Sequence, residues 1–344
     1  MAGRITTTDA VNELHQQTMK AMVQKEYGPA SDVLGMREVP VPEISASDVL
    51  VRVHSSSVNA LEWHLTNGKP YVFRAAFGLS PRSPTLGADI SGTVVEVGPD
   101  VTRFASGDEV FGSIGSGAYA EYAGVSETLV VPKPANVSFE AAAAVGVAGL
   151  TALQGLRDVG GLGSGESVLI NGASGGVGTY AIQVARALGA HVTAVVSTRN
   201  VGQARDLGAD VVIDYQKDDV TEAADRFEVI FDIPGNQSLR KLKRMLAPGG
   251  TYVMVGGPKH DWTGPLFRLI RGKFVFALGG KRDASFTAES RAEDLATLGQ
   301  WLESGQIRSV IEDTFPLADV AIALDRQGQF HARAKTVINV EGTL

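Results

Sequence analysis

The 344-residue chain contains no cysteine. This absence excludes disulfide bridges and thiolate metal ligands, and it removes any reason to infer an oxidising compartment. Charged residues make up only 20% of the chain, and the net charge of −7 offers no electrostatic basis for binding nucleic acid or an anionic membrane. With 44% apolar residues, the chain is predicted to be globular. Its length suits about two domains.

Long apolar runs and metal-ligand spacings are missing as well. Residues 1–20 contain no stretch resembling the hydrophobic part of a signal peptide, and we interpret them as a polar N-terminal extension. No window approaches the roughly 18 uninterrupted apolar residues of a spanning helix. The six histidines are scattered without ligand-like spacing, so no metal site is predicted. The sequence therefore predicts a cytoplasmic protein with neither a membrane nor a nucleic-acid partner.

A glycine-rich segment, Asn171–Gly178, is the most informative feature that the sequence does contain. It follows the apolar run 167–170 and precedes a helix-like stretch, Thr179–Leu188. A strand, a glycine turn and a helix in this order suit a dinucleotide pyrophosphate, because glycines allow close approach and a helix N-terminus offers free N–H groups. An ordinary glycine-rich turn of an α/β protein is the alternative. The pattern predicts cofactor contacts from Ala173, Ser174, Gly175, Gly176 and Val177.

The next predicted strand, His191–Val196, is followed by Ser197, Thr198 and Arg199 rather than by an acidic residue. NAD sites place a carboxylate at this strand end, roughly 20 residues after the glycines, to hold the ribose hydroxyls. Hydroxyl groups and a guanidinium instead suit a 2′-phosphate, and Tyr215, after the following strand, adds a hydroxyl on the same side. A solvated surface arginine is the alternative for Arg199. The pattern favours NADPH as the cofactor.

The chain divides into a β-rich part, a βαβ part and a short return. Short strand-like runs such as 48–54 and 91–97, with a first strand from Ala21, predict an antiparallel, barrel-like domain. Between about residues 139 and 280, apolar strands alternate with helices, which predicts a doubly wound parallel sheet. The predicted domains are 21–145 with 285–344, including a helix at Ala292–Glu303, and 146–284. We expect the active site in the cleft between them.

Several further segments carry a resemblance to a known family. They are Ser56–Trp63, Leu86–Gly92, Gly107–Gly112, Gly117–Tyr122 and Ala148–Ala152. Together with the glycine-rich loop, they resemble the medium-chain dehydrogenase/reductase superfamily, and within it the zinc-free quinone oxidoreductase branch, which includes zeta-crystallin. The resemblance implies an oxidoreductase with a Rossmann domain for NADPH and a GroES-like barrel domain for the substrate.

Zinc ligands that alcohol dehydrogenases of this superfamily carry are absent. No cysteine lies near Asn59, and Ala88 replaces the histidine of a Gly-His-Glu-x-x-Gly segment whose counterpart is Gly87–Gly92. The four-cysteine structural zinc lobe is also missing. A catalytic zinc needs about three protein ligands, so the resemblance implies hydride transfer without a Lewis acid. Quinones, enals and enones meet this condition, because the added charge delocalises onto a carbonyl oxygen that hydrogen-bond donors stabilise.

The resemblance also assigns individual residues. Asn59 is expected beside the nicotinamide ribose and the substrate, with a turn asparagine as the alternative. Tyr71 is expected at the edge of the substrate pocket, where its phenol either donates to the substrate or simply packs. Glu62 stands where many relatives have aspartate. Further cofactor contacts are expected from Thr151 at the start of a linking helix, from Gly256, Gly257, Ala277 and Leu278 at strand ends, and from Arg333 and Lys335 toward the phosphates or in a solvated basic turn.

Three functions stay open at this point. The first is NADPH-dependent reduction of a quinone or an α,β-unsaturated carbonyl compound. The second is a pathway-specific enoyl or carbonyl reductase, which pocket residues between Trp63 and Phe77 and within 262–267 would decide. The third is a non-catalytic, NADPH-binding or RNA-binding crystallin-like protein, against which the intact glycine loop and the negative charge argue. Relatives are commonly dimers, and Lys273–Leu278 is expected to form a strand that extends the sheet in a homodimer.

Overall fold

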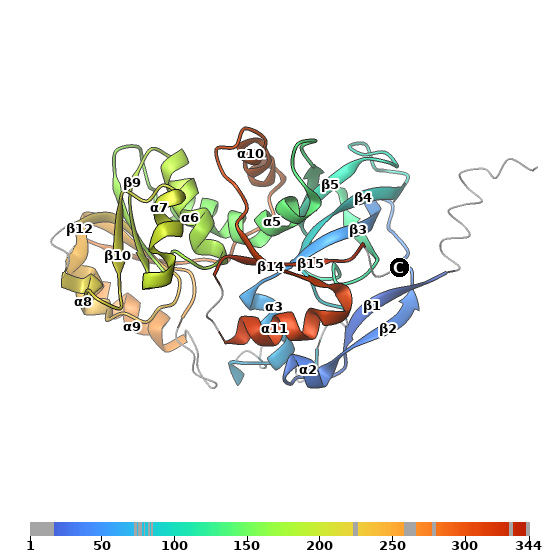
Figure 1. Cartoon of the computed structure of the whole chain (residues 1–344), viewed down its shortest axis with the longest axis horizontal. Coiled ribbons are helices and arrows are strands. Elements are labelled where there is room, and N and C mark those ends of the chain that lie inside the picture. The colour runs from blue at the N-terminus through green and yellow to red at the C-terminus, as the bar shows by residue number, and fades with distance from the viewer. Residues whose placement is uncertain are drawn as a thin grey trace, which may run out of the picture.

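The computed structural model describes residues 17–71, 74, 78, 80–81, 83, 85–222, 226–257, 266–276, 280–329 and 333–341. Within these residues the chain forms one six-stranded sheet, one seven-stranded sheet and a two-stranded ribbon (Figure 1). The six-stranded sheet lies at one end of the molecule and the seven-stranded sheet at the other, with helix α5 (Phe139–Gln154) running between them (Figure 1).

The six-stranded sheet is parallel and has the order β10-β9-β8-β11-β12-β13. Its strands are β8 (Ser167–Asn171), β9 (His191–Val196), β10 (Val211–Asp214), β11 (Phe227–Asp232), β12 (Leu246–Met254) and β13 (Arg282–Ser285). In β8, Val168 and Ile170 pack into one hydrophobic core and Leu169 into another, because successive side chains of a strand point to opposite faces. Both faces are therefore covered, as a parallel sheet requires.

Two layers of helices cover this sheet. One layer contains α6 (Gly176–Ala187) and α7 (Val201–Asp206), and the other contains α8 (Leu239–Met245) and α9 (Leu266–Phe276) (Figure 1). The arrangement is a doubly wound α/β domain, as the alternation of strands and helices predicts.

The seven-stranded sheet has the order β14-β15-β3-β4-β5-β7, and β6 also pairs with β3. Its strands are β3 (Asp48–Val58), β4 (Asp89–Val97), β5 (Glu109–Ser113), β6 (Tyr122–Ser126), β7 (Val130–Pro132), β14 (Ile311–Pro316) and β15 (Lys335–Asn339). All these pairs are antiparallel except β14 with β15. Strand β15 pairs with β3 through Thr336 and Val58, so the C-terminal return lies in the same sheet as the N-terminal strands.

Smaller elements complete this part of the molecule. The ribbon consists of β1 (Thr18–Gln24) and β2 (Leu34–Pro40), and the helices are α2 (Ala30–Val33), α3 (Ala60–Asn67), α10 (Ala292–Glu303) and α11 (Val320–Gly328). Strand β1 begins at Thr18, three residues before the predicted start at Ala21, and Met19 is buried. The polar extension predicted for residues 1–20 therefore ends inside a strand.

One predicted strand is wrong. Residues 273–276 belong to helix α9, and the strand that lies at that edge of the sheet is β13. Leu269 and Phe276, one heptad apart, pack with the core beneath α8, which is the spacing of a helix face. A short apolar run cannot be assigned to a strand or a buried helix from its pattern alone. Residues 277–279, which include the predicted cofactor contacts Ala277 and Leu278, lie outside the described residues.

Helix α5 bears on two further expectations, the absence of an uninterrupted apolar run and the place of Thr151. With its π-helical continuation it forms a 21-residue segment, Phe139–Val159, whose length and mean hydropathy of 1.4 would suffice to cross a membrane. However, 72% of its most apolar window is buried inside the protein. Its residues belong to a hydrophobic core that also contains residues of the six-stranded and the seven-stranded sheet. It is thus the central core helix of this fold. Thr151 lies near the end of α5 and not at the start of a helix.

Candidate functional site

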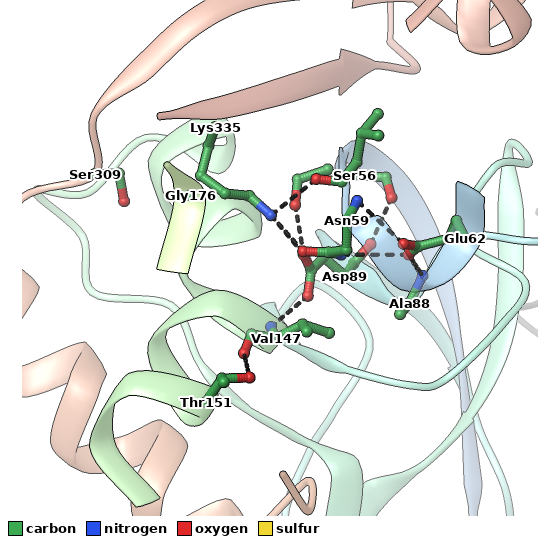
Figure 2. Close-up of polar contacts among 12 residues, drawn as sticks. Ser56, Asn59, Glu62, Ala88, Asp89, Val147, Thr151, Gly176, Ser309 and Lys335 are labelled. Carbon is green, nitrogen blue, oxygen red and sulfur yellow. Dashed lines mark hydrogen bonds and ion pairs between the residues drawn. The ribbon is translucent and has the colours of Figure 1, made fainter. Parts of the chain in front are cut away.

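Four polar side chains from distant parts of the sequence meet beside α5. Figure 2 shows Asn59, Glu62, Asp89 and Lys335 pointing toward one another, and their exposed fractions are 8%, 1%, 0% and 3%. Asn59 is the N-cap of α3, a position that asparagine favours. Glu62, three residues later, accepts a hydrogen bond from the Asn59 backbone N–H at 3.0 Å, as in a capping box. We call these four residues the buried polar cluster.

Asp89, at the start of β4, is the centre of this cluster. Its Oδ1 accepts the Val147 backbone N–H of α5 at 2.6 Å, and its Oδ2 accepts Asn59 Nδ2 at 2.9 Å and the Ser57 hydroxyl. A Cβ atom at Gly146 would lie 2.3 Å from Asp89 Oδ1, so only glycine permits this approach to the helix. Asp89 therefore fastens the end of β3 to α5.

Lys335, the first residue of β15, supplies the positive charge. Its Nζ donates to Asn59 Oδ1 at 2.5 Å and to the Val58 carbonyl at 3.1 Å, and it lies 3.4 Å from Asp89 Oδ2. The stem of the side chain crosses the glycine loop, since a Cβ at Gly176 would lie 2.9 Å from Lys335 Cδ (Figure 2). In this arrangement the ammonium has no N–H left for a phosphate, contrary to the role expected of it, because the buried carboxylate of Asp89 attracts it instead.

The side-chain amide of Asn59 is also engaged in hydrogen bonds within the cluster. Its Nδ2 donates to Asp89 and, over a longer 3.3 Å, to Glu62 Oε1, while its Oδ1 accepts from Lys335. To donate to a substrate, as predicted, Asn59 must exchange one of these bonds. The bond to Glu62 is the weaker of the two, because hydrogen bonds lose strength with distance.

Glu62 is a buried carboxyl group that sequence reasoning left without a role. Burial and the charge of Asp89 raise the pKa of Glu62 from 4.5 to about 7, while hydrogen bonds and the charge of Lys335 oppose the shift. The Ala88 backbone N–H donates to its Oε1 at 3.0 Å. Asp89 was likewise overlooked as a site residue. The signal that could have identified it is an acidic residue between Ala88 and Ile90, just before a predicted strand, since buried carboxylates require partners.

The raised pKa of Glu62 predicts a pH-dependent stability. Between about pH 4.5 and 7 the folded protein holds a proton that the unfolded chain releases. The contribution of Glu62 to the free energy of unfolding should therefore fall as the pH rises through this window, by about 3 kcal/mol in total, and stay constant above it. Urea unfolding of wild type and Glu62→Gln at several pH values measures this slope. The exposed control Glu303→Gln should keep the slope, and a slope unchanged in Glu62→Gln would contradict the prediction.

The glycine loop has the geometry that close approach of a ligand requires. Gly172 adopts a φ of +82°, which favours glycine, and a Cβ at Gly178 would lie 2.3 Å from the Gly172 carbonyl oxygen. Helix α6 begins at Gly176, within the loop and not at Thr179 as expected, and its N-cap Gly175 has no side chain to occupy the first N–H groups. The Ser174 carbonyl accepts the Ala334 N–H at 2.8 Å, so the residue before β15 holds the loop in place. The predicted contacts 173–177 thus surround a free helix N-terminus, which fits a dinucleotide pyrophosphate.

At the carboxyl end of β9, the predicted phosphate-binding residues meet an unexpected carboxylate. Thr198 Oγ1 donates to Asp214 Oδ2 at 2.6 Å, and Lys217 forms an ion pair with the same oxygen at 3.3 Å. The hydrogen bond from Thr198 lowers the pKa of Asp214. The sequence showed no acid at this strand end because Asp214 comes from the neighbouring strand β10. Ser197 accepts from the Asn200 amide, Arg199 is exposed, and Tyr215 is 54% exposed.

The remaining predicted residues occupy different surroundings. Thr151 Oγ1 donates to the Val147 carbonyl at 2.7 Å, one turn from the cluster (Figure 2). The Tyr71 ring lies 4.8 Å from the Arg74 guanidinium, which also covers Tyr27. Arg333, which is exposed, donates through Nε to Gln203 Oε1 at 2.6 Å.

Gly256 and Gly257 follow β12 where two strand ends converge. A Cβ at Gly256 would lie 2.4 Å from the Ile233 carbonyl oxygen, and a Cβ at Gly235 would lie 2.9 Å from Gly257 Cα. Small residues are therefore required at this edge of the parallel sheet. Open α/β sheets bind ligands outside the carboxyl ends of their strands, so the placement suits the predicted contact with a cofactor.

The donor set beside Ala88 differs from that of a metal site. Ala88 offers a methyl group, and both oxygens of Asp89 already accept hydrogen bonds from the protein. Across the part of the chain that the structure describes, no three His, Cys, Asp or Glu side chains are placed to hold a metal ion. These residues do not fit a zinc ion, because it needs about three protein ligands with free lone pairs.

Known proteins resemble the chain over most of its length. Residues 45–135 match the family model described as alcohol dehydrogenase GroES-like domain, and residues 207–338 match the one described as zinc-binding dehydrogenase. A chloroplast envelope quinone oxidoreductase homolog of Arabidopsis thaliana is 30% identical, over 93% of this chain and 98% of that protein. An NADPH-dependent alkenal/one oxidoreductase of the same plant is 32% identical, over 93% and 79%. The solved quinone oxidoreductase of Coxiella burnetii has a TM-score of 0.83 at 29% identity, over 94% and 100%.

Proposed function

The chain belongs to the quinone oxidoreductase branch of the medium-chain dehydrogenase/reductase superfamily, and we propose that it reduces quinones or α,β-unsaturated carbonyl compounds with NADPH and without a metal. The observation that carries the proposal is that both carboxylate oxygens of Asp89 already bind groups of the protein. Its carboxylate is bound to Val147, Asn59 and Lys335 beside Ala88, where zinc-dependent members have a histidine ligand. The positive charge that balances this carboxylate is an ammonium group of the protein.

The glycine loop supports the choice of a nicotinamide cofactor. The N-terminus of α6 and the close-packed Gly172 and Gly178 would hold the pyrophosphate, and the loops after β11 and β12 lie at the strand ends where open α/β sheets bind ligands. The bound nucleotide supplies the hydride. The names of two relatives support the substrate class, because one is a quinone oxidoreductase homolog and the other an alkenal/one oxidoreductase.

The residues of this chain then have to orient the acceptor and stabilise its developing charge. Without a Lewis acid, a saturated carbonyl or alcohol is a poor substrate, whereas a conjugated acceptor spreads the charge onto its oxygen. Asn59 is the most exposed member of the buried polar cluster, and its 3.3 Å bond to Glu62 is the one that a substrate oxygen would replace. Water suffices to protonate the resulting anion, so the proposal needs no dedicated acid.

The test is NADPH oxidation, followed by absorbance, with a panel of acceptors. The panel holds 1,4-benzoquinone, a 1,2-quinone, an enone, an enal and a saturated aldehyde, each with and without a chelator. The proposal expects turnover of a quinone, the enone or the enal, unaffected by the chelator. Turnover of the saturated aldehyde alone, or activity lost with the chelator, would overturn it. If NADPH binds but nothing in the panel reacts, a dedicated substrate is indicated, and if NADPH does not bind, a non-catalytic role is.

The preference for NADPH over NADH is part of the proposal, and Arg199 provides its test. Arg199 follows β9 beside Thr198, whose partner Asp214 is held by Lys217. We expect Arg199→Ala to lower kcat/KM for NADPH about 10-fold and to leave that for NADH nearly unchanged, because only NADPH carries the 2′-phosphate. Steady-state kinetics with both nucleotides measure this, with exposed Arg271→Ala as the control. An equal loss for both nucleotides would contradict the assignment.

A homodimer and a cytoplasmic location stay proposals. Strand β13 is one of the two edge strands of the parallel sheet, and α9 beside it exposes Phe267 and Phe274, 60% and 77%. Apolar groups of this size on a surface helix support an interface with a second copy. Light scattering on the purified protein gives its mass in solution.

A further inference from the structure

A second buried polar network lies at the carboxyl edge of the parallel sheet. Asp232, the last residue of β11, is 0% exposed. Its Oδ1 accepts Asn171 Nδ2 at 2.8 Å and the Gly235 N–H at 3.1 Å, and its Oδ2 accepts the Tyr252 hydroxyl at 2.8 Å. The carboxylate thereby joins the ends of β8, β11 and β12.

The counter-charge of Asp232 comes from outside the sheet. Arg268 of α9 has a side chain that is only 10% exposed, and its Nη2 donates to Asp232 Oδ2 at 2.8 Å. Its Nη1 donates to the Gln237 carbonyl at 2.8 Å, and its Nε to the Tyr252 oxygen at 3.0 Å. All three nitrogens of the planar guanidinium thus donate to different groups, which a lysine ammonium could not reproduce in the same geometry.

The stem of Arg268 also lies beside Gly235, in the loop that follows β11. A Cβ at Gly235 would lie 3.2 Å from Arg268 Cδ and 2.9 Å from Gly257 Cα. Asn171, which Asp232 holds, immediately precedes the glycine loop. Arg268 therefore contacts the loop after β11 and Tyr252 of β12 directly, and it is linked to the end of β8 through Asp232. Ligands of open α/β sheets bind outside these strand ends.

We propose that Arg268 is a positioning residue for NADPH, which sets through Asp232 the spacing of the three strand ends that receive the nucleotide. This inference rests on the proposed function. It extends the site to helix α9, which no sequence motif connects with the cofactor. A displacement of these loops by an ångström is enough to weaken binding and hydride transfer, because the reacting atoms must be held in a narrow range of positions.

The experiment compares Arg268→Met, Arg268→Lys and the control Arg271→Met, which alters an exposed arginine of the same helix. NADPH affinity is titrated by fluorescence, and kcat, both KM values and Tm are measured for each variant. We expect Arg268→Met to raise the Kd of NADPH about 10- to 100-fold, Arg268→Lys to raise it less, and Arg271→Met to leave it unchanged. The KM of the quinone should change little.

The outcomes separate this inference from the proposed function. A lower Tm with an unchanged Kd for NADPH in the Arg268 variants would show a purely structural ion pair and would overturn the inference alone. If Arg268→Met does not fold, Arg268→Lys provides the same test, because it keeps the positive charge and loses only the planar geometry of the guanidinium. A wild type that binds neither NADPH nor NADH would overturn the proposed function and this inference with it.

Discussion

Replacing Asp89 with asparagine is expected to lower the free energy of unfolding by about 3–5 kcal/mol, because the variant removes the carboxylate that forms the ion pair with a buried ammonium. Lys335 is 3% exposed and lies 3.4 Å from Asp89 Oδ2. Asparagine has a similar shape and its Oδ1 can still accept the Val147 N–H, so the loss does not report a cavity. It reports the charge together with the acceptor oxygen that Asn59, Ser57 and Lys335 share. Urea unfolding at pH 7.5 measures the effect.

A double-mutant cycle identifies the cause. Lys335→Met removes the ammonium, so Asp89→Asn should cost much less in that background than in wild type. The exposed pair of Lys241 and Asp219 serves as the matched control, and Asp219→Asn should have a much smaller effect, because solvent screens that pair. A loss below about 1 kcal/mol for Asp89→Asn, or additivity in the cycle, would show that the ion pair does not hold the site together.

Replacing Gly178 with alanine is expected to weaken NADPH binding about 100-fold, which corresponds to about 2.7 kcal/mol. The new Cβ would lie 2.3 Å from the Gly172 carbonyl oxygen and 2.6 Å from Ala173 Cα. Both contacts are to backbone atoms, so no side chain can move aside. The turn must open, and the N–H groups that are proposed to bind the pyrophosphate move out of position.

Gly202→Ala is the control for this substitution. Gly202 also lies in a helix that follows a strand of the same sheet, but a Cβ there meets no atom within 4 Å. Its NADPH affinity should equal that of wild type, and fluorescence titration compares the two variants directly. Wild-type affinity in a folded Gly178→Ala protein would exclude this loop as the nucleotide site.

Local sequence patterns were sufficient where local interactions decide the structure. The bounds of β9 and α10 agree with those predicted, and the glycine loop follows a strand and opens a helix as expected. Alternation of apolar and polar residues and the conformational freedom of glycine act within a few residues, so they are visible in the sequence. The strand predicted for residues 273–276 was wrong, because a short apolar run suits a strand and a buried helix alike.

Taken by itself, the sequence determined the two kinds of domain, the place of the glycine loop between a strand and a helix, and the absence of cysteine. Only the tertiary structure decided which charges face one another. Lys335 meets Asp89 and Asn59 across more than half of the chain, and Arg268 of α9 meets Asp232 of β11. Such pairings depend on how the sheets and helices pack, and burial then makes each pairing obligatory, because a buried charge without a partner is costly. Residue types and their spacing do not show which of these distant residues become neighbours.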